Sequence, residues 1–203
     1  MAFYLESGYT SLNKKGEELC GDKVESVVNG DYTTLVLADG MGSGEAAHRE
    51  AAMTVRLLRQ FLQAKGVHFA SETDTEVVAQ LLEFYYNECH DFLEAVGRVL
   101  RRIEGAYALG MLCADCPDRI IAARKDAPLL LGYGKGCNFL ASDVTAIIKH
   151  TRDVAYMEDG EVAVLTREGI EVYDALEQKV EKKHFTIDWE VSAAEKGGYQ
   201  HFM

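Results

Sequence analysis

Residues 33–66 combine a strand, an acidic glycine-rich turn and a long helix, and this unit constrains the fold more than any other stretch. Residues 33–38 are β-branched and aliphatic, which predicts a strand buried on both faces. The turn at 39–45 reads Asp-Gly-Met-Gly-Ser-Gly-Glu, and its three glycines let the backbone approach a ligand closely. Apolar residues then recur at helical spacing, namely Ala47, Ala51, Val55, Leu58 and Leu62. Gly66 follows where a C-terminal cap is expected.

The order of glycines in this turn excludes two common phosphate-binding motifs. A Walker loop ends in Gly-Lys-Ser/Thr and a dinucleotide fingerprint reads G-x-G-x-x-G, whereas this turn reads G-x-G-x-G without a lysine. Two interpretations remain open. The carboxylate of Asp39 and the carbonyl of Gly40 suit a hard cation such as Mg or Mn. Alternatively, Asp39-Gly40 is a tight turn that caps the helix.

A hairpin signal brings a second aspartate into the metal hypothesis. A strand expected at 23–28 is followed by Asn29-Gly30, which favours a tight hairpin into the next strand. Antiparallel pairing would place Asp22 near Asp39, and two carboxylates that converge repel each other unless a cation lies between them.

Composition favours a compact protein and disfavours polyanionic partners. The chain has 203 residues, 48% hydrophobic content and two prolines, enough to bury a core in a single domain. The net charge of −12 disfavours nucleic acid or an anionic membrane as a partner, because both need a basic face. Since no segment is long and apolar enough to span a bilayer and the first residues do not form a signal peptide, we expect a cytoplasmic protein.

The five cysteines are expected to be reduced thiols. An odd number without a paired framework is typical of an intracellular chain. Cys113-x-x-Cys116 has no second pair and no histidine nearby, so it is a weak zinc signal. Cys116 is followed by Pro117-Asp118, and we interpret this stretch as a turn.

Two helices are expected after Gly66. Residues 71–76 open the first with a capping box formed by Thr73 and Glu76, and Asp74 in its first turn favours the helix dipole. Its apolar face is Val78, Leu81, Leu82 and Tyr85. The second helix should bury Leu93, Val96, Leu100 and Ile103 and expose Arg98, Arg101 and Arg102.

From Gly105 onwards short apolar runs alternate with turns, which predicts antiparallel strands. The expected strands are 106–113, 120–124, 129–133, 138–141, 154–157, 162–166 and 170–173, with hairpin turns at 134–136, 158–160 and 167–169. Asp159-Gly160 is interpreted as a turn, since its setting is that of a hairpin. His150 has no partner at ligand or triad spacing, so we interpret it as structural.

The first 60 residues resemble the opening of PPM-type phosphatases of the stage II sporulation protein E family. The similar stretches are residues 8–13, 16–22 and 38–44. The resemblance implies a pair of Mn or Mg ions held by Asp22, Asp39 and the Gly40 carbonyl, with a metal-activated water that attacks phosphoserine or phosphothreonine in a phosphoprotein. The later metal-binding motifs of that family do not appear in this sequence.

Residues 66–203 resemble the latter part of the glutaminase domain of glutamine–fructose-6-phosphate aminotransferases. The similar stretches are 71–76, 104–109, 123–125, 138–143, 150–154, 158–161 and 195–203. The resemblance implies that Asp74 binds the amino group of substrate glutamine, with no cofactor. The nucleophile of that family is an N-terminal cysteine. Met1-Ala2 supplies none, and Cys20 would serve only after cleavage before it.

The chain is therefore interpreted as one composite domain, residues 1–203, with a phosphatase-like portion at 1–65 and a glutaminase-like portion at 66–203. Both resemblances imply the same α+β architecture, a four-layer αββα sandwich of two antiparallel sheets flanked by helices. The arginine motif and Asn-Gly oxyanion element of the glutaminase family would fall in the phosphatase-like portion. The expected function is a glutaminase-like domain without turnover, with a metal-dependent phosphatase or a non-catalytic scaffold as the alternatives.

Overall fold

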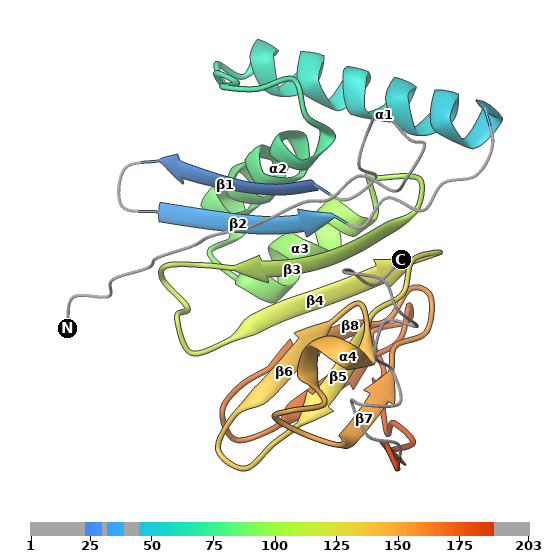
Figure 1. Cartoon of the computed structure of the whole chain (residues 1–203). Helices are drawn as coiled ribbons and strands as arrows, with labels where there is room; N and C mark the ends of the chain where they lie inside the picture. Colours follow the sequence, from blue (N-terminus) through green and yellow to red (C-terminus); the bar gives the residue numbers. More distant parts are fainter. Residues whose placement is uncertain (1–22, 30–31, 39–44, 189–203) are drawn as a thin grey trace.

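The computed structural model describes residues 23–29, 32–38 and 45–188, with side chains from residue 54 onwards, and these residues form an α+β sandwich (Figure 1). The helices are α1 (Glu45–Ala64), α2 (Asp74–Cys89), α3 (Phe92–Leu100) and the short α4 (Val144–Ile147). The strands are β1 (Lys23–Asn29), β2 (Tyr32–Ala38), β3 (Tyr107–Leu112), β4 (Ile120–Lys125), β5 (Leu130–Tyr133), β6 (Asn138–Ala141), β7 (Asp153–Tyr156), β8 (Val162–Leu165), β9 (Ile170–Tyr173), β10 (Lys179–Val180) and β11 (Phe185–Thr186).

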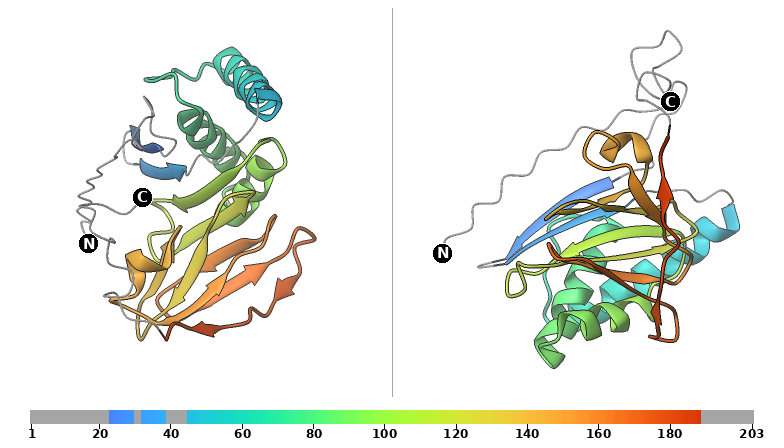
Figure 2. Two further views of the ribbon diagram at one scale, coloured as in Figure 1. Left: turned by 45° about the vertical axis from the view of Figure 1, so that its right-hand side comes forward. Right: turned by 90° about the horizontal axis from the view of Figure 1, so that it is seen from below.

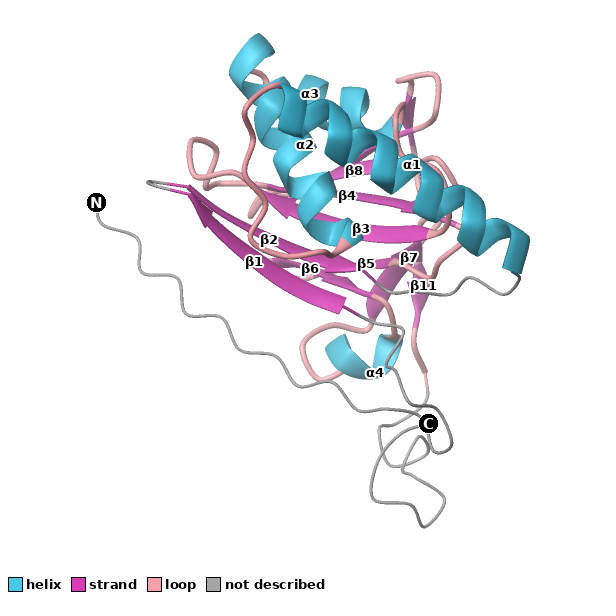
Figure 3. Cartoon of the chain, turned by 90° about the horizontal axis from the view of Figure 1, so that it is seen from above, coloured by secondary structure: helices cyan, strands magenta, loops and turns pink. Residues whose placement is uncertain are grey.

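Two antiparallel sheets form the body of the sandwich. One has the strand order β10-β9-β8-β4-β3, and the other has the order β11-β7-β5-β6. The hairpin of β1 and β2 forms a two-stranded sheet of its own and lies beside β3 (Figure 2). Helices α1, α2 and α3 cover the outer side of the five-stranded sheet, while α4 lies on the opposite side of the molecule (Figure 3).

Alternation of side chains along the strands separates three hydrophobic layers. In β4, Ile121 packs with the helices while Ala122 faces the second sheet. In β5, Leu131 lies between the sheets while Leu130 packs with α4. Apolar layers on both faces of each sheet are the reason for the four-layer αββα order, which confirms the expected fold class.

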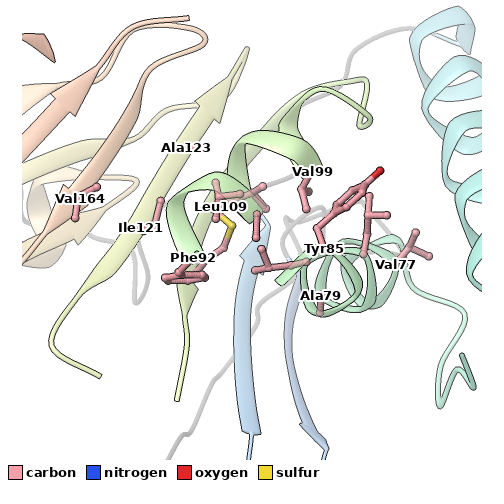
Figure 4. Packing of buried hydrophobic residues seen from close by; sticks show 14 of the residues in the cluster. Val77, Ala79, Tyr85, Phe92, Val99, Leu109, Ile121, Ala123 and Val164 are labelled. Atoms are coloured by element: carbon pink, nitrogen blue, oxygen red, sulfur yellow. The ribbon is translucent and has the colours of Figure 1, made fainter. Parts of the chain in front are cut away.

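The layer between the helices and the five-stranded sheet holds the largest cluster of buried side chains. Val77 and Tyr85 of α2, Phe92 of α3 and Leu109 of β3 belong to this cluster (Figure 4). Val77 is fully buried and Leu109 is 2% exposed. This layer fixes α2 against the sheet.

Gly132 in β5 marks the closest approach between the second sheet and the segment around α4. A Cβ on this glycine would lie 2.8 Å from Ile147 Cδ1 and 2.9 Å from Thr151 Cγ2. The Thr151 hydroxyl also donates a hydrogen bond of 2.5 Å to the carbonyl of Tyr133. A residue without a side chain is therefore needed at this position.

Helix α1 ends as the sequence predicts. The Gly66 amide bonds the Gln63 carbonyl at 3.0 Å, and the Val67 amide bonds the Leu62 carbonyl at 3.0 Å. With Gly66 at φ 89°, this is a Schellman motif, which favours glycine because of its left-handed backbone. The layer between the helices and the five-stranded sheet includes three predicted core residues of this helix, Val55, Leu58 and Leu62.

The seven predicted strands after Gly105 are present to within one residue at each end, but one predicted hairpin is wrong. Residues 158–160 connect β7 to β8, and these two strands lie in different sheets. The turn therefore crosses the sandwich. The turns at 134–136 and 167–169 do close hairpins, as the pairs Tyr133–Asn138 and Leu165–Ile170 show. No sequence pattern predicted the two-residue strands β10 and β11.

The predicted buried face of α3 also needs correction. Its buried residues are Phe92, Ala95, Val96 and Val99, and Leu93 is 38% exposed. The helix begins at Phe92 because the Asp91 side chain accepts the Glu94 amide at 2.9 Å. Of the predicted residues, Val96 is buried and Leu100 and Ile103 pack against the same hydrophobic cluster, so only Leu93 was placed wrongly.

Among the described residues, no helix combines the length and apolarity needed to cross a membrane.

Candidate functional site

The loop between α1 and α2 leads into Asp74, the predicted substrate-binding residue and the first residue of α2. Arg59 on α1 reaches across to this loop and donates hydrogen bonds to the carbonyls of Ser71 and Thr73, at 2.7 and 3.0 Å. Its guanidinium also lies 4.4 Å from the centre of the Phe69 ring, in a cation–π arrangement. Arg59 therefore fixes the position of the residues that lead into α2.

Glu76 fixes the same loop from the side of α2. Its carboxylate, 1% exposed, accepts the amides of Ala70 and Ser71 at 2.7 and 2.6 Å and the Ser71 hydroxyl at 2.6 Å. Burial by itself raises the pKa of Glu76, but the hydrogen bonds from Ser71 and Ala70 outweigh it, so the pKa lies below its usual range. The loop is thus closed around an ionised carboxylate.

Asp74, the first residue of α2, follows directly from this closed loop. Thr73 is the N-cap, and its hydroxyl accepts the Glu76 amide at 3.2 Å. The Asp74 carboxylate is exposed, and its Oδ1 accepts the amide of Thr75 at 2.9 Å. An exposed carboxylate with a fixed backbone is suited to bind a small cationic group such as an ammonium.

A cavity of about 570 Å³ lies beside this loop. Its lining comes from the end of α1 and from the loop itself, namely Arg59, Gln63, Gly66, Val67, His68, Phe69, Ala70, Ser71 and Glu72. The cavity borders the residues that precede Asp74, so the region has room for a small molecule.

The predicted metal ligands Asp22, Asp39 and Gly40 lie outside the described residues, as does Cys20. The β1–β2 ladder ends at the pair Lys23–Ala38, which are the residues next in sequence to the two aspartates. Within the described part of the chain, no group of three or more His, Cys, Asp or Glu side chains is arranged to hold a metal ion.

Asp159 forms a fixed contact between β4 and the β7–β8 turn. Its carboxylate pairs with Arg124 and accepts the Asp126 amide at 2.9 Å. The Asp126 amide, with help from the Arg124 guanidinium, holds the pKa of Asp159 below its usual range.

His150 is exposed and its ring stacks on the ring of Phe139, with 5.4 Å between the ring centres, in a packing role.

Sequence reasoning missed the two residues, Arg59 and Glu76, whose hydrogen bonds hold the loop before Asp74 in place. Glu76 was expected as half of a capping box, and Thr73 does accept the Glu76 amide. The Glu76 carboxylate, however, bonds Ala70 and Ser71 further back in the chain. The charge of Glu76 in a predicted first turn was the available signal for this role. No sequence pattern indicated Arg59.

A comparison with protein families matches residues 53–149 of this chain to a glutamine amidotransferase domain. This match includes α2, Asp74 and the residues of the locked loop. It covers slightly less than half of the chain and supports a resemblance to glutamine amidotransferase domains.

Curated relatives that share one name are similar to this chain over a longer stretch. The chain is 54% identical over 146 residues to glutamine–fructose-6-phosphate aminotransferase of Caldanaerobacter subterraneus, covering 72% of this chain and 24% of the relative. It is 43% identical over 156 residues to the enzyme of the same name from Thermotoga maritima, covering 77% of this chain and 25% of the relative. The chain thus spans about a quarter of the length of these relatives. Its resemblance to their glutaminase domain is supported.

A solved structure supports the fold. Glutamine phosphoribosylpyrophosphate amidotransferase from B. subtilis superposes with a TM-score of 0.57 at 20% identity, over 72% of this chain and 30% of that one. This similarity confirms the architecture of two antiparallel sheets with helices.

Proposed function

We propose that the chain binds glutamine as a glutaminase-like domain of a glutamine–fructose-6-phosphate aminotransferase and does not hydrolyse it. The observation that carries this proposal is the exposed carboxylate of Asp74 at the start of α2. Hydrogen bonds made by Arg59 and Glu76 hold the loop that precedes it. In the family that the chain resembles, the matching aspartate binds the amino group of glutamine. The ammonium–carboxylate pair would orient the substrate, and a charge-assisted bond of this kind is short and strong.

The positions of the described cysteines support binding without turnover. Cys89 lies at the end of α2, which has 16 residues and is therefore about 24 Å long, whereas Asp74 lies at its start. Cys113 and Cys116 lie in the β3–β4 turn, whose Asp115 contacts Tyr86 in the last turn of α2. Cys137 lies in the β5–β6 turn. Cys137 lines a cavity together with Asp118 of the β3–β4 turn, so it also lies towards the far end of α2. None of these four thiols is therefore placed to attack the side-chain amide of a glutamine held by Asp74.

We also infer that the chain is a composite and that the portion before residue 53, where the match to the glutamine amidotransferase domain begins, derives from a PPM-type phosphatase. The observations that favour it are the Asp22 and Asp39-Gly40 motifs and the register of the β1–β2 ladder, which ends at Lys23–Ala38. Mn or Mg would be the metal, and a phosphoprotein would be the substrate. With too few ligands for a two-metal site, we expect at most weak hydrolysis.

Isothermal titration with L-glutamine and an assay for released ammonia test the main proposal. We expect saturable binding to the wild type, loss of binding in Asp74→Asn, no change in Glu168→Gln, and no ammonia from any of the three. Glu168 is an exposed carboxylate in the β8–β9 turn and does not line the cavity beside Asp74, so it controls for general charge effects. Ammonia release by the wild type would refute the absence of turnover, and binding that survives in Asp74→Asn would refute the role of Asp74.

Thermal melting with and without millimolar Mn tests the phosphatase alternative, because a ligand that binds only the folded state raises stability. A rise in melting temperature that disappears in Asp39→Asn would support a metal site. An equal melting temperature in both conditions would contradict it.

A further inference from the structure

The connection between β3 and β4 carries a pair of thiols to which the proposed function gives no role. The strands pair up to Leu112–Ile120, so residues 113–119 close the hairpin. Two successive turns fill this connection: the Cys116 amide bonds the Cys113 carbonyl at 3.1 Å, and the Arg119 amide bonds the Cys116 carbonyl at 3.4 Å.

The first of these turns brings the two cysteines within disulfide range. The hydrogen bond from residue 116 to residue 113 is that of a β-turn, which keeps its first and fourth Cα atoms less than about 7 Å apart. Disulfides need a Cα separation of about 4.4–6.8 Å. Both cysteines are free thiols in the structure.

The surroundings hold this turn in place and leave it accessible. On one side, the Tyr86 hydroxyl donates to Asp115 at 3.1 Å, and both cysteines pack against the helix-side core. On the other side, Pro117 and Arg119 contribute to the wall of a cavity of about 440 Å³. Both thiols are only partly buried, so a small reagent can reach them.

We propose that Cys113 and Cys116 are a site of reversible disulfide modification by low-molecular-weight disulfides. In the first step, the thiolate of one cysteine attacks a sulfur of the small disulfide, forms a mixed disulfide and releases one small thiolate. In the second step, the thiolate of the other cysteine attacks the protein sulfur of that mixed disulfide and releases the second small thiolate. The pair loses two electrons and two protons, and the small disulfide is reduced to two thiols.

The chemistry of the site favours exchange over metal binding. A structural zinc site uses four ligands, and among the described residues no third His, Cys, Asp or Glu joins the two thiols in a metal-binding arrangement. Burial raises the pKa of the Cys116 thiol, and the neighbouring Cys113 adds to this, although Arg119 opposes it. Because the thiolate is the nucleophile, the exchange should accelerate as the pH rises through the neutral range.

The test is incubation of the native full chain with oxidised glutathione, followed by whole-protein mass spectrometry and disulfide mapping. We expect a product that has lost two hydrogens, with its disulfide between Cys113 and Cys116, and we expect dithiothreitol to reverse it. Its rate of formation should be higher at pH 8.5 than at pH 7. No reaction, or a disulfide that joins any other pair, including one with Cys20, would overturn the proposal.

Single substitutions separate the two steps. In Cys113→Ser or Cys116→Ser, the remaining thiol of the pair should stop at the stable glutathione adduct, since its partner is absent. Cys89→Ser and Cys137→Ser are matched controls, and both should still form the Cys113–Cys116 disulfide. Accumulation of a stable adduct on Cys113 or Cys116 in the wild type would contradict the second step.

Discussion

Replacement of Glu76 by glutamine tests whether an ionised carboxylate closes the loop that precedes Asp74. In the wild type this side chain accepts three hydrogen bonds of 2.6–2.7 Å from Ala70 and Ser71. Hydrogen bonds to charged groups contribute about 1.5–3 kcal/mol each. Glutamine keeps one oxygen and presents an NH₂ group where the second carboxylate oxygen accepted a hydrogen bond, so at least one donor loses its acceptor.

We expect Glu76→Gln to lower the free energy of unfolding by about 3 kcal/mol at pH 7. For a domain of this size, that loss corresponds to a melting temperature lower by about 6–12 °C. Urea denaturation followed by circular dichroism measures the difference. Glu72→Gln is the control, and we expect less than about 0.5 kcal/mol from it because its side chain is exposed.

The same variant should change how stability depends on pH. The pKa of Glu76 is lower in the folded protein than in the unfolded chain, so the folded state binds fewer protons at this group. Its stabilising contribution is complete above the unfolded pKa of about 4.3 and is lost as the pH falls through the folded pKa. The difference in free energy of unfolding between the wild type and Glu76→Gln should therefore become smaller in acid. A gap below about 1 kcal/mol at pH 7, or one that widens under acid, would refute the reasoning.

Three further substitutions test other contacts. Lys182→Ala leaves the buried Glu161 carboxylate without the ammonium that lies 2.9 Å from both its oxygens, so we expect urea denaturation to show a free energy of unfolding lower by about 3–5 kcal/mol. Replacement of the exposed Lys183 by alanine is the control and should lower it by under about 0.5 kcal/mol. Equal losses in the two variants would contradict a buried ion pair. Gly132→Ala should cost about 1–3 kcal/mol through overpacking, and a neutral result by thermal melting would show that the neighbouring side chains adapt. Arg59→Ala should speed hydrogen exchange of the amides at residues 70–73, and unchanged exchange would mean that Arg59 does not order the loop.

The sequence predicted the strands of the second half well because each is a short apolar run between turn residues. Residues 138–141 and 170–173 agree with the structure at both ends. What the pattern could not show is which sheet a strand joins. Residues 158–160 have the composition of a hairpin turn, but the Asp159 contact with Arg124 belongs to a crossing between sheets, and it depends on residues 35 positions apart.

The sequence supplied Asp74 as the candidate site residue but not the contacts that support the loop before it. Asp74 was identified from a resemblance to a family, since a single exposed aspartate at a helix start has no distinctive pattern. Arg59 and Glu76 act through backbone groups of Ser71 and Thr73, and backbone acceptors and donors leave no trace in the sequence. Such supporting contacts become visible only once the loop geometry is known.

The most direct test of the central claim is a titration of the ¹⁵N-labelled chain with L-glutamine, followed residue by residue in amide NMR spectra. If the Asp74 carboxylate binds the amino group of glutamine, the largest saturable shifts should occur at the amides of residues 73–76, and Asp74→Asn should abolish them while D-glutamine produces weaker ones. Shifts that centre on another part of the chain, or a spectrum unchanged at saturating glutamine, would contradict the account.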